Sequence, residues 1–205
     1  MLPGLGADHR LLAPQQQAFP DLIVPRWVTP RRAESLAEYA ALLAAEMPPM
    51  SRLVLGGVSL GGMIAYEMAR HLRPEAVVLV ASCCRRESLQ HFIPGWRRMV
   101  SSTPAWAIQC AKWCSPLAGR FMVGVTPDVA KLCTTMFRDG DGQFMRWALR
   151  AIAQWTPASL DGIPVRQIHG AKDHLIPARN IRADEMLPVF QCMRLGLSAL
   201  KSQRL

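Results

Sequence analysis

The pentapeptide Gly57-Val58-Ser59-Leu60-Gly61 is the feature that most constrains how this chain can fold. It stands between an apolar run from Arg52 to Gly56, which is typical of a buried strand, and a stretch from Leu60 to Leu72 with the apolar spacing of a helix. A serine between glycines at a strand-to-helix turn is exposed at the end of a sheet, where a base and backbone amides can reach it. The motif therefore predicts a nucleophile elbow with Ser59 as the nucleophile.

The elbow also predicts which groups would stabilise a negatively charged intermediate. One oxyanion donor is the backbone N–H after the serine, here that of Leu60, and a second comes from a loop after another strand. The glycine-rich stretch Leu2-Pro3-Gly4-Leu5-Gly6 is the candidate loop, with the Leu5 N–H as its donor. A glycine-rich turn with an incidental serine is the alternative that remains open. A phosphate-binding P-loop is excluded because its lysine is missing.

Outside the elbow, short apolar runs alternate with helical stretches. We expect a strand interrupted by Pro25 across residues 22–28, a helix from Glu34 to Glu46, and a central strand from Ala76 to Ala81. The strand pattern returns from Ile163 to Ile168. This alternation predicts an α/β fold, with a mostly parallel sheet and flanking helices.

The alternation stops between residues 84 and 159, where prolines and the turn Asp139-Gly140-Asp141-Gly142 separate several helical stretches. We interpret residues 1–205 as a single domain and 84–159 as a helical insertion within it, because 205 residues suffice for one sizeable core. The tryptophans and methionines of the insertion are interpreted as core packing in preference to an apolar pocket. Residues 189–205 form an atypical tail without a clean pattern.

Composition narrows the choice of partners. The formal net charge of +9 would suit an anionic partner, but the arginines are scattered as pairs without a nucleic-acid motif, so we expect none. No long apolar run and no signal-peptide pattern is present, which predicts a cytoplasmic protein without a membrane segment. The six cysteines show no C-x-x-C spacing and are interpreted as structural thiols. No metal or organic cofactor is implied, and the oligomeric state stays open.

Three motifs resemble, in chain order, the α/β-hydrolase family of serine-nucleophile hydrolases with a helical cap. They are Leu2-Pro3-Gly4-Leu5-Gly6-Ala7-Asp8, Gly57-Val58-Ser59-Leu60-Gly61-Gly62 and His169-Gly170-Ala171-Lys172-Asp173-His174-Leu175-Ile176-Pro177. The resemblance covers residues 1 to about 185. It implies that Asp173 is the acid of a catalytic triad and that 84–159 is the cap. An ordinary surface turn is the alternative for Asp173, and Asp8 is a weaker candidate for the acid.

The resemblance also implies a histidine in a glycine-rich turn roughly twenty residues after the acid, and no such turn follows Asp173. His174 is adjacent to the acid and badly placed to bridge it to the nucleophile. His169 ends a strand, where a packed or hydrogen-bonded histidine is usual. His9, near the candidate oxyanion loop, is the one spare imidazole left to consider near Ser59, and it is a weak candidate.

The family resemblance implies a carboxylic-ester or related acyl hydrolase, which forms an acyl-enzyme on Ser59 with a small-molecule acyl substrate. Without a base we expect only weak activity, because the oxyanion hole and substrate binding then act alone. The alternatives are a non-catalytic pseudo-hydrolase that binds an acyl ligand in a capped pocket, or a truncated or frameshifted product. The net charge alone suggests a third class, a protein with an anionic partner.

The missing histidine generates a prediction about the gene. Residues 183–188 still resemble the family strand, whereas Val189 to Leu205 do not, and codons for Cys192-Met193-Arg194 can spell His-Ala in a shifted frame. We therefore expect a frame change between about Leu187 and Cys192, and coding sequence upstream of Met1. Reading all three frames checks this: a Gly-His turn with a helical continuation is expected in another frame, and its absence contradicts the hypothesis.

Overall fold

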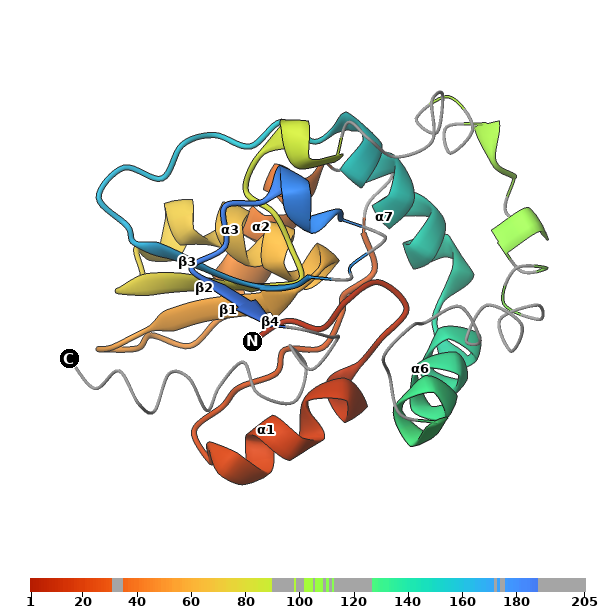
Figure 1. Ribbon diagram of the computed structural model, residues 1–205, viewed down its shortest axis with the longest axis horizontal. Helices are drawn as coiled ribbons and strands as arrows, with labels where there is room; N and C mark the ends of the chain where they lie inside the picture. The colour runs from red at the N-terminus through yellow and green to blue at the C-terminus, as the bar shows by residue number, and fades with distance from the viewer. Residues whose placement is uncertain are drawn as a thin grey trace.

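A parallel sheet of four strands, in the order β1-β2-β3-β4, forms the centre of the computed structural model (Figure 1). The strands span Val54–Val58, Ala76–Val80, Val165–Gly170 and Glu185–Leu187. The structure describes residues 1–30, 35–89, 98, 102–104, 106–108, 110, 112, 127–171, 173 and 176–187. The predicted α/β class with a parallel sheet and flanking helices is confirmed.

Two strands are displaced from the ranges that the sequence predicted. β1 and β3 each begin and end two residues later than expected, so that β1 includes Gly56 and Gly57 and β3 extends to Gly170. Glycine has a low strand propensity, but here the backbone hydrogen bonds decide: Gly56 and Gly57 lie in register with Val78 and Leu79 of β2. Tertiary pairing has overridden local preference.

The strand expected across residues 22–28 is wrong, because these residues adopt no regular structure. Side chains take up part of their backbone hydrogen bonding: the Tyr39 hydroxyl accepts from the Val28 N–H at 3.2 Å and donates to the Val28 carbonyl at 2.9 Å. Pro25 has no N–H to give to a ladder. Residues 22–28 therefore form an ordered connection without regular secondary structure.

The helices lie on both faces of the sheet (Figure 1). On one face α2 (Leu36–Ala45), α3 (Leu60–Leu72) and α7 (Gly142–Gln154) share a core with alternate strand residues, Leu55, Val77 and Leu79. On the other face η1 (His9–Leu12), α1 (Ala13–Ala18) and α6 (Pro127–Asp139) lie near the second core, which contains Leu11, Leu12, Val58, Val78, Val80, Met136 and Ile168. Successive side chains of a strand point to opposite faces of the sheet, so the same strands contribute to both cores.

Several predicted element boundaries are confirmed. α3 has the predicted bounds. α2 begins two residues later and ends one residue earlier than predicted, after a capping box in which Ser35 and Glu38 exchange hydrogen bonds. The predicted break at 139–142 separates α6 from α7, with Asp141 as the N-cap of α7. Two short 3-10 helices, η2 (Arg86–Leu89) and η3 (Ala178–Asn180), complete the described elements.

The expected insertion at 84–159 is described only in part, and the tail 189–205 lies outside the described residues. Trp155 and Met145 are buried, in agreement with core packing, whereas Trp106 is 69% exposed. No helix in the described part of the chain is long and apolar enough to cross a membrane.

The start of α3 approaches its neighbours unusually closely. Leu2 pairs with β1 through its N–H to the Gly56 carbonyl, 2.8 Å, and its carbonyl to the Val58 N–H, 3.0 Å. A Cβ on Gly61 would overlap the backbone carbonyls of Leu2 and Pro3, and a Cβ on Gly57 would overlap the backbone of Gly61. Only glycine allows this meeting of strand, helix and N-terminal segment.

We predict that Gly61→Ala destabilises the protein by about 3 kcal/mol or more, because rigid backbone would have to move to admit the methyl group. The control is Gly162→Ala: Gly162 has φ +76° but no atom within 4 Å of its hypothetical Cβ, so only backbone strain of about 1 kcal/mol is expected. Urea unfolding checks both. Equal losses in the two variants would contradict the close-approach explanation.

Candidate active site

Ser59 has the strained backbone of a tight strand-to-helix turn, with φ 50° and ψ −118°. Positive φ is uncommon for a residue with a side chain and persists only where the surroundings enforce it. The Ser59 N–H donates to the Val80 carbonyl of β2 at 3.0 Å. Its carbonyl accepts from the Gly62 N–H at 2.9 Å and from the Ser82 hydroxyl at 2.7 Å. The Met63 N–H also donates to the Ser59 carbonyl, at 3.2 Å, so four neighbouring groups fix the elbow.

The two predicted oxyanion donors lie in the segments that flank Ser59. Leu60 is the first residue of α3, where helix geometry leaves the N–H without an intrahelical partner. Within the described part of the chain, neither the Leu5 nor the Leu60 N–H donates a hydrogen bond. Both amides are thus free to receive an oxyanion.

A four-residue turn carries Leu5 to this position. The Ala7 N–H donates to the Gly4 carbonyl at 3.1 Å, and Gly6 supplies the positive φ, +72°, that such a turn requires. A Cβ on Gly4 would lie 3.7 Å from the Ser59 Cβ, so the turn starts directly beside the elbow. The structure therefore brings Ser59, Leu60 and the turn of Leu5 together at the carboxyl edge of β1.

Asp173 follows β3 and is 7% exposed, unlike a surface turn residue. Its Oδ1 accepts from the Ile176 N–H at 2.9 Å, and its Oδ2 lies 3.4 Å from Nε2 of the fully buried His169. His169 Nε2 is also 2.8 Å from the Ile176 carbonyl, which can only accept, so this nitrogen carries a proton. The predicted hydrogen-bonded role of His169 is confirmed, and it supports the acid loop.

No imidazole among the described residues contacts the Ser59 hydroxyl, which has no hydrogen-bond partner there. His9 is 65% exposed and lies 3.9 Å from Asp8, so the structure does not place it against the nucleophile. His71 is exposed in the last turn of α3. His174 and His91 lie outside the described residues. The described site therefore holds Ser59 and Asp173, the predicted nucleophile and acid, with no bridging imidazole among the described residues.

Cys83 is the other candidate nucleophile near the ends of the strands. It is fully buried, and burial raises the pKa of its thiol to about 12. A thiol with that pKa stays protonated at neutral pH and is a poor nucleophile. Among the described residues no cluster of His, Cys, Asp and Glu could hold a metal ion. Ser59 is thus the nucleophile that the geometry favours.

A cavity of about 120 Å³ lies beside the Gly4–Ala7 turn. Ser59 does not line it; Gly6 of the turn does. The other lining residues come from the end of the turn, from residues 27–29, and from α6, α7 and the link between these helices. They are mostly apolar: Ala7, Asp8, Trp27, Val28, Thr29, Met136, Gly140, Asp141, Phe144 and Met145. A ligand group in this space would therefore sit next to the turn that carries Leu5.

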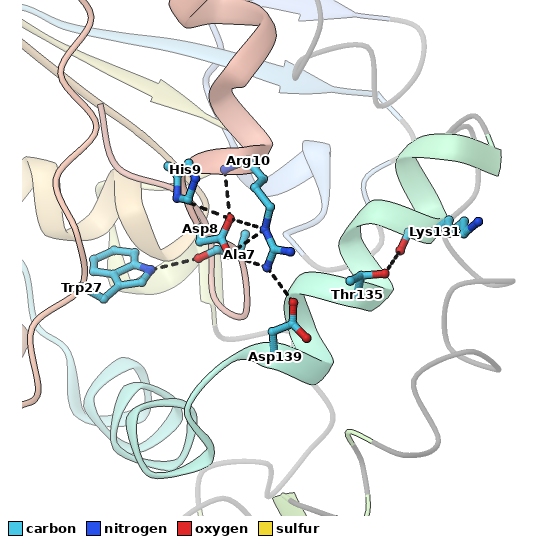
Figure 2. A network of polar contacts seen from close by, with 8 residues as sticks. All are labelled: Ala7, Asp8, His9, Arg10, Trp27, Lys131, Thr135 and Asp139. Carbon is cyan, nitrogen blue, oxygen red and sulfur yellow. Dashed lines mark hydrogen bonds and ion pairs between the residues drawn. The ribbon is translucent and has the colours of Figure 1, made fainter.

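Polar contacts hold the far end of this turn (Figure 2). The Trp27 indole N–H donates to the Ala7 carbonyl at 3.0 Å, and Arg10 forks onto both oxygens of Asp8 and also reaches Asp139. Asp8, the weaker candidate for the acid, is thus paired with Arg10. The hydrogen bond from Arg10 holds the pKa of the Asp8 carboxyl below its ordinary value. Sequence reasoning singled out Asp8 but missed both Arg10 and Asp139.

Ser82 is the supporting residue that sequence reasoning missed, because nothing in the sequence links it to Ser59. We predict that Ser82→Ala lowers the free energy of unfolding by about 1 kcal/mol and raises the mobility of the elbow, since a buried hydrogen bond to the Ser59 carbonyl is lost. Ser88→Ala is the matched control, because that buried hydroxyl also donates to a carbonyl, of Asn180, at 3.0 Å.

Chemical denaturation and amide exchange of residues 57–63 check the pair. Both variants should lose similar stability, but only Ser82→Ala should speed exchange in the elbow. Faster exchange there in both variants, or in neither, would contradict the assigned role of Ser82.

Comparisons with known proteins add information on the fold. No protein-family model and no curated protein matches the sequence. Solved structures do match: an esterase from Thermogutta terrifontis is 16% identical, with a TM-score of 0.71 over 99% of this chain and 86% of that chain. Epoxide hydrolases of the α/β hydrolases superfamily, from hot-environment metagenomes, give 16% identity and a TM-score of 0.63 over 98% and 87%. The type II thioesterase BorB of the borrelidin cluster gives 17% and 0.62 over 98% and 88%.

Proposed function

The chain has the α/β-hydrolase fold, and on that premise we propose that it is a serine hydrolase of carboxylic esters or related acyl substrates. The observation that carries the proposal is Ser59, strained at φ 50° between two segments whose Leu5 and Leu60 amides have no hydrogen-bond acceptor among the described residues. The esterase and thioesterase among the structural neighbours act on acyl groups by name. Their chemistry supports the same substrate class here.

The proposed reaction runs through an acyl-enzyme. The Ser59 Oγ attacks the carbonyl carbon, and the Leu5 and Leu60 N–H groups donate to the oxyanion as the carbonyl π bond opens. Solvent water takes the hydroxyl proton of Ser59. When the tetrahedral intermediate collapses, the bond to the leaving oxygen or sulfur breaks, that atom takes a proton from water and leaves as the alcohol or thiol, and the acyl group remains on Ser59. Water then adds to the ester and releases the acid, which restores the serine.

Proton transfer limits this sequence. The hydroxyl proton of Ser59 must leave during attack, and no described imidazole is in contact to accept it. Loss of the base from a complete triad costs about 10⁶-fold in kcat, although binding and the oxyanion hole still contribute. Asp173, buried and held by His169, would orient a base but does not contact the hydroxyl among the described contacts. We therefore propose slow acyl transfer by this chain.

Covalent labelling tests the nucleophile. A fluorophosphonate probe is expected to label the protein slowly and with one-to-one stoichiometry, because the oxyanion donors also stabilise the negatively charged oxygen of the phosphorus adduct. Ser59→Ala should abolish the label, whereas Ser159→Ala, at an exposed serine, should not change it. Intact-protein mass spectrometry gives the stoichiometry. An unlabelled wild-type protein, or a label that survives in Ser59→Ala, would contradict the proposal that Ser59 is the nucleophile.

Added imidazole tests whether the base limits the rate. A free imidazole can accept the Ser59 proton, so ester hydrolysis by the wild-type protein should rise with imidazole concentration beyond the background of Ser59→Ala with the same imidazole. Equal increases in the two proteins would show that proton transfer at Ser59 is not what limits turnover.

A second candidate function is ligand binding without turnover, favoured by the cavity beside the turn and by the absence of a base contact among the described residues. A short-chain carboxylic acid or ester should then raise the melting temperature in proportion to its occupancy. Thr29→Trp, which fills the exposed rim of the cavity, should remove this shift, whereas Gln154→Trp, exposed at the end of α7, should keep it. Ligand stabilisation with no fluorophosphonate label would favour binding alone.

A further inference from the structure

Arg10 joins two parts of the chain that are distant in sequence. Its Nη2 is 2.7 Å from Asp8 Oδ2 and 2.9 Å from Asp139 Oδ2, and its Nε is 3.0 Å from each Asp8 oxygen. Asp8 follows the Gly4–Ala7 turn, whereas Asp139 is the last residue of α6 (Figure 2). One guanidinium thus bridges the turn that carries the proposed oxyanion donor and a helix from the segment between β2 and β3.

The geometry of this bridge needs arginine. A planar guanidinium presents several N–H donors in fixed directions, so it can hold a carboxylate by two bonds and still reach a second one, which a lysine ammonium does less well. The Asp8 side chain also caps η1 by accepting the Arg10 N–H at 2.9 Å. The backbone of the turn and the guanidinium are therefore locked in one arrangement.

Two further contacts show that α6 lies against the same turn. A Cβ on Gly6 would overlap the Phe137 ring, so the backbone of the turn packs directly on this helix. Met136 of α6 lines the cavity together with Gly6 and Asp8. Displacement of α6 would consequently remove one wall of the turn and one wall of the cavity together.

We infer that Arg10 is a positioning residue that couples the conformation of the Gly4–Ala7 turn to the seating of α6 through Asp8 and Asp139. The functional consequence rests on the proposed function: the Leu5 N–H points correctly at an oxyanion only while α6 is seated on the turn. The Asp8 carboxyl has a pKa below its ordinary value because Arg10 donates to it.

The test separates this coupling from general stability. Arg10→Met removes the guanidinium, and Asp139→Asn removes the charge of the second carboxylate and so weakens the bridge to α6; both nearly keep side-chain volume. Arg52→Met and Glu75→Gln are matched controls, because Arg52 also forks onto a carboxylate, at 3.0 and 3.2 Å, but at the opposite end of β1. Hydrogen–deuterium exchange, read by mass spectrometry, is measured on the full chain for residues 1–12, α6 and α3.

The bridge variants are expected to speed exchange in residues 4–9 and in α6 together, with α3 unchanged, and the controls should change neither segment. Arg10→Met combined with Asp139→Asn should be no faster than Arg10→Met alone, because both changes break the same link. Unchanged exchange in residues 4–9, or equal changes in the controls, would overturn the inference.

Labelling of Ser59 by the fluorophosphonate supplies the functional readout. The bridge variants should label about 10-fold more slowly than the wild type, as expected for a misplaced donor, and the controls should label at the wild-type rate. Faster exchange with an unchanged labelling rate would overturn the claimed link to the oxyanion donor. If the wild-type protein takes no label, the proposed hydrolase function fails, and the exchange experiment alone still decides whether Arg10 couples the turn to α6.

Discussion

The close approach of backbone segments at Gly57 and Gly61 is the constraint on which the rest of the site depends. Because neither residue has a Cβ, the first turn of α3 can rest on β1 and on the carbonyls of Leu2 and Pro3. That contact forces the chain to reverse within one residue, and Ser59 takes the strained φ of 50°. This strained conformation persists only because β2 and Ser82 hydrogen-bond the backbone of the elbow on its other side.

The parts of the site differ in how they are held. Ser59, the proposed nucleophile, sits on the junction of β1 and α3, where β2, the first turn of α3 and the Ser82 hydroxyl all hydrogen-bond its backbone. The turn that carries Leu5 has only one end tied to the sheet, through Leu2. Its other end depends on Trp27, Arg10 and α6, which come from separate stretches of the chain. Oxyanion stabilisation is therefore the component most sensitive to how the segment between β2 and β3 packs.

Asp173, the candidate acid, is also held by contacts from its own loop and from a buried neighbour. Asp173 is buried at the end of β3, and His169 beneath it donates into the same loop, so the carboxylate is oriented without contact to Ser59 among the described residues. Under the proposed function, Ser59 and the Leu5 and Leu60 amides are placed in advance, and proton transfer is the slow step. The proposed functions, slow acyl transfer and acyl binding, differ in that step alone and share the same architecture.

The sequence by itself determined the class of fold and the position of the elbow, because strand–glycine–serine–glycine–helix is a local pattern and α3 follows its period to the predicted bounds. It also indicated Asp173 and the Leu5 turn, each through a short motif. Tertiary structure decided what no local pattern encodes: the two-residue displacement of β1 and β3, the failure of residues 22–28 to form a strand, and the partners Ser82, His169 and Asp139. The physical reason is that these depend on hydrogen bonds and packing between segments far apart in the chain, and Arg10 meets a carboxylate 129 positions away.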